Sequence, residues 1–251
     1  MSIVVKDLHK SFGTKQILKG FSLDVTDGET LSIIGHSGAG KSVTLKTILG
    51  LVKPDAGEVW VDGNNVHTLE RDALYVHRRN VGYVFQFAAL FDSMTIRDNV
   101  AMGLRRIKTM TEGEIQHRVS ACLYLVDLAG AEDRRPSELS GGMQKRAGLA
   151  RAIATQPKYL LYDEPTTGLD PVTTTTIDGL ITRMSEELGV TGIVVTHDMT
   201  SAYRISDRIA MLHEGCIRMI GTPEEIQASD DPVVKGFVEG RPDLVQREKP
   251  L

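Results

Sequence analysis

The chain carries one segment that restricts its fold more than any other, the glycine-rich run GHSGAGKS at residues 35–42. The apolar run TLSIIG, at residues 30–35, precedes it, and residues 42–52 have the apolar spacing of a helix. A strand buried on both faces, a glycine-rich turn and a helix are the parts of a phosphate-binding loop. Glycine lets backbone N–H groups approach phosphate oxygens, and the helix N-terminus adds partial positive charge. We therefore expect this loop to bind the phosphates of a nucleotide.

The side chains of the loop indicate which atoms meet the phosphates and a metal ion. We expect Lys41 to reach the β and γ phosphates of ATP and Ser42 to coordinate Mg²⁺. ATP and Mg²⁺ are thus the expected ligands. The predicted nucleotide-binding residues of the loop are Gly35, Ser37, Gly38, Gly40, Lys41, Ser42 and Val43.

Two later apolar runs end in residues suited to phosphate chemistry. YLLYDEP, at residues 159–165, is a buried strand that brings Asp163 to its end, where a carboxylate can hold Mg²⁺ through water. Glu164 follows it and is placed to polarise an attacking water as general base. His197 ends the run GIVVTH at the same edge of the sheet, where we expect it to sense the γ-phosphate. The candidate catalytic residues are Glu164, His197 and Lys41.

The alternation of short strands and helices predicts an α/β fold with a mostly parallel sheet. The alternating run GEVWVDG at residues 57–63 adds an antiparallel β subdomain near the N-terminus. Residues 87–158 have a helical pattern and predict a helical lobe inserted in the core, with Gly130 expected to end the helix that starts near residue 112. The other expected elements are strand 159–163, helix 171–188, strand 192–197, a short helix at 199–205 and a strand pair at 208–220.

Composition argues against several classes of protein. The formal net charge is −4 and the basic residues are dispersed, so we expect no nucleic-acid partner. The two cysteines have neither CxxC spacing nor a nearby histidine pair, which argues against a metal site or a disulfide framework. No apolar run approaches the roughly 18 residues that span a bilayer, and charges interrupt the N-terminal segment where a signal peptide would be apolar. If the protein acts at a membrane, we expect another subunit to anchor it.

The run LSGGM at residues 139–143 stands just ahead of a long helical stretch. Together with the three segments above, and in the same order, it resembles the nucleotide-binding subunit of ABC transporters over nearly all of the chain. The resemblance implies a P-loop ABC ATPase core, adenine stacking by Phe12, and a glutamine at Gln86 that senses Mg²⁺ and the transmembrane partner. It further implies that the metal-associated residues are Ser42, Gln86 and Asp163. Residues expected to act between two subunits are Ser140, Gly141, Gly142 and Asp170, the first three on the γ-phosphate of ATP held by the other copy.

A homodimer is expected on physical grounds as well. A serine hydroxyl and two glycine N–H groups at a helix N-terminus make an anion site, yet this site is far in sequence from the phosphate-binding loop. Two copies related by a two-fold axis would place each signature over the phosphates of the other. Closing and opening of such a dimer would move the helical lobes and convert hydrolysis into mechanical work.

We interpret residues 1–240 as a single ABC ATPase domain and residues 241–251 as a polar tail that is mobile unless a partner orders it. Three function classes compete: a transporter motor, a soluble ABC ATPase on ribosomes or DNA, and a P-loop enzyme that modifies a small molecule. LSGGM has no function in a small-molecule kinase. The single cassette, without heptad runs or cysteine clusters, favours a motor with a separate membrane subunit.

The transported substrate is indicated by local strings only. The segments at residues 85–105, 138–154 and 162–171 resemble the Mla-type phospholipid-transport ATPases, and LFDSMTIRDNV at 90–100 is the most telling of them. This resemblance implies a peripheral subunit at the cytoplasmic face of the inner membrane, an integral membrane permease as partner, and in addition a small accessory subunit and a lipid-binding protein. An importer of amino acids or other small solutes is the alternative.

Overall fold

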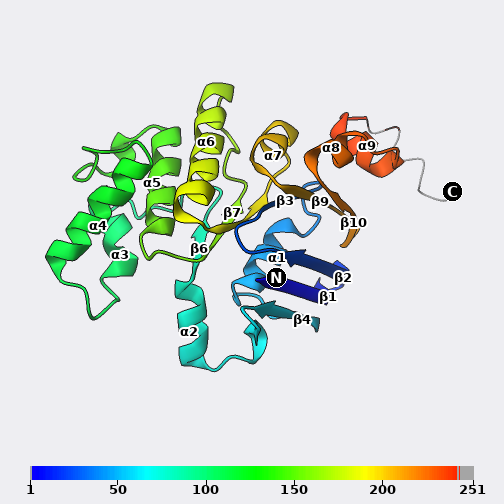
Figure 1. The fold of residues 1–251 in the computed structure, drawn as a ribbon, viewed down its shortest axis with the longest axis horizontal. Coiled ribbons are helices and arrows are strands. Elements are labelled where there is room, and N and C mark those ends of the chain that lie inside the picture. Colours follow the sequence, from blue (N-terminus) through cyan, green and yellow to red (C-terminus); the bar gives the residue numbers. More distant parts are fainter. Residues whose placement is uncertain (1, 242, 244–251) are drawn as a thin grey trace.

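The computed structural model describes residues 2–241 and residue 243. The central sheet has the strand order β10-β9-β3-β8-β7-β6, and it extends across the middle of the view in Figure 1. All neighbours in this sheet are parallel except β10, which pairs antiparallel with β9. Its strands are β3 (Thr30–Ile34), β6 (Val81–Val84), β7 (Tyr159–Asp163), β8 (Thr191–Val195), β9 (Arg208–His213) and β10 (Cys216–Gly221). Every residue of β3, β7 and β8 is buried, as expected for strands covered on both faces.

A second, antiparallel sheet has the order β2-β1-β4-β5. Helix α1 (Lys41–Ile48) contacts β4, β7 and β8, and its Leu45 and Ile48 belong to the apolar cluster that joins the two sheets. The strands of the second sheet are β1 (Ile3–Phe12), β2 (Lys15–Val25), β4 (Ala56–Val61) and β5 (Asn64–Asn65). The predicted fold class, a mostly parallel sheet with an antiparallel sheet and helices, is confirmed.

Three helices between β6 and β7 pack on one another at one end of the molecule, α3 (Ile96–Leu104), α4 (Glu112–Leu125) and α5 (Gly141–Ile153) (Figure 1). The helical pattern predicted from residue 87 begins only at Ile96, where the Thr95 side chain caps α3 by accepting a hydrogen bond from the Asp98 N–H. The assignment of residues 87–158 to a helical lobe inserted in the core remains a prediction.

The expectation that Gly130 ends helix α4 is wrong. The helix ends at Leu125, and Asp127 takes the left-handed conformation that usually selects glycine, with φ 54°. The N–H of Leu128 bonds to the Leu123 carbonyl and the N–H of Asp127 to the Tyr124 carbonyl. This pair of bonds closes a helix C-terminus, and an aspartate can supply its left-handed residue.

Among the remaining helices, α2 (Arg71–Arg79) contacts β6, α7 (Met199–Ile205) contacts β3, and α8 (Pro223–Gln227) contacts β9 and β10. Asp170 caps α6 (Pro171–Leu188), and Gly189, with φ 61°, ends it, so the predicted bounds agree with the observed ones. Helices α2, α8 and α9 were not anticipated from the sequence. Helix α9 spans Pro232–Val238, and short 3₁₀ turns occur at Val66–Thr68 and Pro136–Glu138.

Within the part of the chain that the structure describes, no helix has both the length and the apolar character needed to cross a membrane. The predicted tail, residues 241–251, lies outside the described residues apart from Arg241 and Asp243.

Candidate active site

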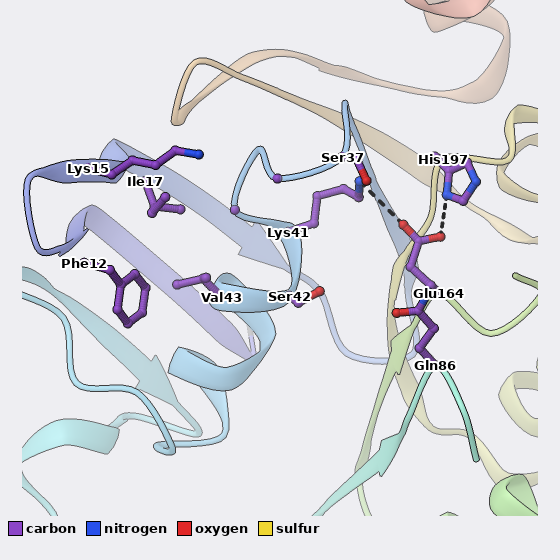
Figure 2. Close-up of a pocket in the computed structure, with 12 residues that line it drawn as sticks. Phe12, Lys15, Ile17, Ser37, Lys41, Ser42, Val43, Gln86, Glu164 and His197 are labelled. Atoms are coloured by element: carbon purple, nitrogen blue, oxygen red, sulfur yellow. Dashed lines mark hydrogen bonds and ion pairs between the residues drawn. The ribbon is translucent and has the colours of Figure 1, made fainter. Parts of the chain in front are cut away.

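A cavity of about 370 Å³ opens beside the glycine-rich loop, near the carboxyl ends of the parallel strands. Figure 2 shows that its walls come from β1 and β2 on one side and from the residues that follow β6, β7 and β8 on the other. Most of the sequence-predicted site residues lie here. The lining residues are Phe12, Lys15, Ile17, Ser37, Gly38, Gly40, Lys41, Ser42, Val43, Gln86, Glu164 and His197.

The glycine-rich loop needs glycine where it meets β2. Gly40 has φ 112°, and a Cβ there would lie 2.9 Å from Ile17 Cγ2 and 3.0 Å from Leu18 Cδ2. Lys41, the first residue of α1, is buried and folds back into the loop, donating to the Gly35 carbonyl at 2.7 Å. The loop thus holds a lysine ammonium beside backbone N–H groups and a helix N-terminus, which is an environment for phosphate.

Asp163, the last residue of β7, has both carboxylate oxygens engaged by hydroxyl groups. Ser42 Oγ donates to Oδ1 at 2.6 Å, and the Tyr83 hydroxyl donates to Oδ2 at 2.8 Å. Burial and the neighbouring Asp163 charge raise the pKa of Tyr83 far above its usual value, so that this phenol keeps its proton. Asp163 itself is not a lining residue and reaches the cavity through Ser42.

The oxygen donors near the cavity fit Mg²⁺. Ser42 supplies a hydroxyl, Asp163 a carboxylate and Gln86 an amide, and Mg²⁺ prefers few protein oxygens, completed by water and phosphate. No group of three or more histidine, cysteine or acidic side chains able to cage a metal occurs among residues 2–241 and 243.

Three side chains contact Glu164, and Figure 2 draws two of these contacts, those with Lys41 and His197. Its Oε1 lies 3.5 Å from Lys41 Nζ, and its Oε2 lies 2.7 Å from His197 Nδ1 and accepts a hydrogen bond from Thr167 Oγ1 at 3.1 Å. Its backbone is in the left-handed region, φ 51°, which is costly for a residue with a Cβ. A carboxylate only accepts hydrogen bonds, so His197 Nδ1 carries a hydrogen in this contact.

His197 does not end its strand as predicted. β8 stops at Val195, and His197 stands two residues further, with a side chain that is 60% exposed. This position lets the ring turn toward Glu164 while its other nitrogen remains free to meet a ligand in the cavity.

Besides Gly35 and Asp163, four predicted residues lie away from the cavity lining. Ser140 caps α5, accepting a hydrogen bond from the Met143 N–H, and Asp170 caps α6 in the same way with the N–H groups of Val172 and Thr173. The two helix N-termini adjoin, since a Cβ on Gly142 would lie 2.5 Å from Thr173 Cγ2. A single chain therefore does not bring Ser140, Gly141, Gly142 or Asp170 to the cavity.

Phe12 does reach the cavity. The residue is 52% exposed, and the Lys10 ammonium lies 5.4 Å from the ring centroid. The exposed ring face is available for stacking, and Lys15 and Ile17, which the sequence did not single out, line the same wall.

Lys145 was also missed. It is 7% exposed on α5, and its Nζ donates to the Gln86 carbonyl at 2.5 Å and to the Glu164 carbonyl at 3.5 Å. Burial lowers the pKa of Lys145, and the Glu164 charge opposes that shift. Lys145 is four residues before Leu149 and seven before Ala152, so it lies on the apolar face of the helix. This helical spacing was the sequence signal that could have identified Lys145 as buried.

Comparison with known proteins agrees with this geometry. The sequence model of the ABC transporter family matches residues 18–167. Over 241 residues the chain is 42% identical to a probable ribonucleotide transport ATP-binding protein, Mkl, of Mycobacterium leprae, covering 96% of this chain and 70% of that protein. It is 42% identical to the chloroplastic protein TRIGALACTOSYLDIACYLGLYCEROL 3 of Arabidopsis thaliana, covering 95% and 73%.

The chain is also similar to an importer protein in sequence and to a solved structure in fold. Identity to the sulfate/thiosulfate import ATP-binding protein CysA of Caulobacter vibrioides is 42%, covering 95% of this chain and 70% of that protein. A dimeric, post-hydrolysis structure of the ATP-binding cassette MJ0796 with ADP and Pi superposes with a TM-score of 0.81 at 35% identity, covering 88% of this chain and 98% of that one. The chain therefore belongs to the ABC transporter family, as an ATP-binding cassette that hydrolyses ATP.

Proposed function

We propose that this cassette powers phospholipid transport through a separate membrane permease, at the cytoplasmic face of the inner membrane. The observation that carries the hydrolytic part is the contact of Glu164 with Lys41 on one side and His197 on the other, at the edge of the cavity. These are the three residues that we assign to catalysis. Among the described residues that line the cavity, Glu164 is the only one with a carboxylate, which supports its assignment as base.

The residues act in sequence as ATP enters. Phe12 stacks on the adenine, and Lys41 exchanges its 3.5 Å contact with Glu164 for the β and γ phosphates. Glu164 is then free to accept a proton from the water that attacks the γ-phosphorus. His197 orients this carboxylate through Nδ1 and meets the γ-phosphate with the other side of its ring. Ser42, Gln86 and Asp163 would hold Mg²⁺, and the ion would supply positive charge to balance that of the phosphate oxygens.

Two copies complete each site in this proposal. Ser140 and the N–H groups of Gly141 and Gly142 form an anion site at the N-terminus of α5, and none of the three is among the described residues that line the cavity of one chain. A two-fold axis would place this site over the γ-phosphate of the other copy, with Asp170 beside it. The dimeric state named for the MJ0796 structure supports this arrangement.

The lipid assignment rests on the LFDSMTIRDNV segment and on the 42% identity to a plant protein named after a galactolipid. The Mkl and CysA relatives, named for ribonucleotide and sulfate transport, support the alternative of a small-solute importer. A small accessory subunit and a lipid-binding protein belong to the lipid hypothesis. The two functions predict different ligands on the purified permease, a phospholipid for lipid transport and a small solute for an importer.

The permease should contact the segment after β6. Phe87 is 80% exposed, and Phe85 and Phe91 are 40% and 49% exposed, so an aromatic surface lies next to Gln86. We propose that this aromatic surface and the segment Leu90–Leu104 together form the groove that binds the permease. This contact would sense the nucleotide through Gln86 and move with α3.

The test is affinity purification of a tagged cassette from detergent-extracted membranes. We expect an integral membrane protein with bound phospholipid. Phe87→Asp and a charge at Met94 should weaken that association and leave ATP binding intact. Tyr124→Asp, at a similarly exposed aromatic on α4, should leave the association unchanged. A permease bound to a small solute would refute the lipid assignment, and ribosomes or DNA without any membrane protein would refute the transport function.

A further inference from the structure

Tyr83 makes a contact that the proposed reaction does not yet use. It lies on β6 opposite Leu161 of β7, and Asp163 lies two residues further along β7, on the same face. The Tyr83 hydroxyl reaches the Asp163 carboxylate at 2.8 Å. Register alone therefore brings a phenol to the residue that we assign to the metal.

The two oxygens of the Asp163 carboxylate have different partners. Tyr83 occupies Oδ2, and Ser42 Oγ occupies Oδ1 at 2.6 Å. Ser42 lines the cavity, so Oδ1 is the oxygen that faces the phosphate side. A carboxylate without the phenol could rotate and offer either oxygen in several directions.

The ring of Tyr83 is itself held in place by a neighbouring aromatic side chain. Tyr83 packs against Phe85, with ring centroids 4.6 Å apart and planes at 50°. The Tyr83 hydroxyl is the donor in its contact with Asp163, and a donor whose ring is held by packing is suited to fix one orientation of an acceptor.

We propose that Tyr83 is a positioning residue that orients the Asp163 carboxylate for Mg²⁺. The inference rests on the assignment of Asp163 to the metal in the proposed function. Tyr83 touches neither nucleotide nor metal in this role. It acts through Asp163, and its loss should weaken metal binding more than nucleotide binding.

The test measures metal affinity directly. Purified cassette is loaded with ADP and titrated with Mn²⁺, and free Mn²⁺ is followed by electron paramagnetic resonance. Nucleotide affinity is measured in parallel in EDTA with a fluorescent ATP analogue. Tyr83→Phe removes one hydroxyl and should weaken Mn²⁺ binding about tenfold, while affinity in EDTA stays within about twofold of the original chain.

Tyr159→Phe is the matched control. Tyr159 also lies in the central sheet and donates to a carboxylate, Asp62 at 2.6 Å, but neither residue lines the cavity. We expect this variant to bind Mn²⁺ as the original chain does, even if both variants lose thermal stability.

Two results would overturn the inference: unchanged Mn²⁺ affinity in Tyr83→Phe, or an equal loss in both variants. Failure of the proposed metal assignment has a separate signature, since Asp163→Asn would then leave Mn²⁺ binding unchanged. If Asp163→Asn weakens Mn²⁺ binding and Tyr83→Phe does not, the metal assignment holds and the role of Tyr83 is refuted.

Discussion

Lys145 donates a hydrogen bond to the backbone carbonyl of Gln86, with 2.5 Å between Nζ and oxygen. Lys145 lies on the helix that Ser140 caps, and Gln86 lines the cavity. The same ammonium lies 3.5 Å from the Glu164 carbonyl. One buried cation therefore connects the N-terminal part of α5 with the segment after β6 and the segment after β7.

We predict that Lys145→Met destabilises this junction. Two carbonyl groups lose a charged donor, and the expected loss in free energy of unfolding is about 1–3 kcal/mol. ATPase activity should fall as well, because Gln86 and the Glu164 backbone lose a shared anchor. Urea unfolding and steady-state ATPase assays measure the two effects. Lys108→Met, at an exposed lysine, is the control, and equal stability of the two variants would contradict the prediction.

Glu164→Gln should abolish turnover while preserving nucleotide binding. The amide keeps the shape of the side chain but cannot take the proton of the attacking water, so the rate should fall at least about 10²-fold. Mg-ATP should then hold the variant as a dimer in size-exclusion chromatography. Glu187→Gln, at an exposed position on α6, should turn over normally. Hydrolysis near the original rate would remove Glu164 from the base role.

The sequence predicted those features that depend on neighbours along the chain. The glycine-rich loop, the strand that ends at Asp163 and helix α6 depend on local glycine, apolar and capping patterns, and all three occur at the predicted positions. The end of α4 was misplaced because Asp127 accepted the left-handed conformation expected of Gly130. Tyr83 and Lys145 were missed because their partners, Asp163 and Gln86, are 80 and 59 residues away and meet them only in the folded chain.

Asp231 should contribute stability that depends on pH. Partial burial raises the pKa of Asp231, but hydrogen bonds from Arg218 and from the N–H groups of Val234 and Val233 outweigh it and hold the pKa below its usual range. The ionised form therefore stabilises the fold at pH above about 3.9, and the contribution is lost as pH falls through the lowered folded-state pKa.

We accordingly expect Asp231→Asn to be less stable than the original chain near neutral pH, with a difference that narrows below about pH 3.9. Urea unfolding at a series of pH values measures this difference. Asp230→Asn, at the exposed neighbouring carboxylate, is the control. A difference that stays constant with pH would show that the effect comes from packing rather than from charge.

Mixing two inactive variants tests whether each site is completed by the other copy. Lys41→Ala lacks the loop lysine, and Ser140→Arg fills the anion site of α5, so each homodimer should have no intact site. Their heterodimer keeps one site with both halves intact. If pairing is random and the sites act independently, an equal mixture should recover about a quarter of the original activity. Each variant alone must be inactive, and full activity of either would refute the shared site.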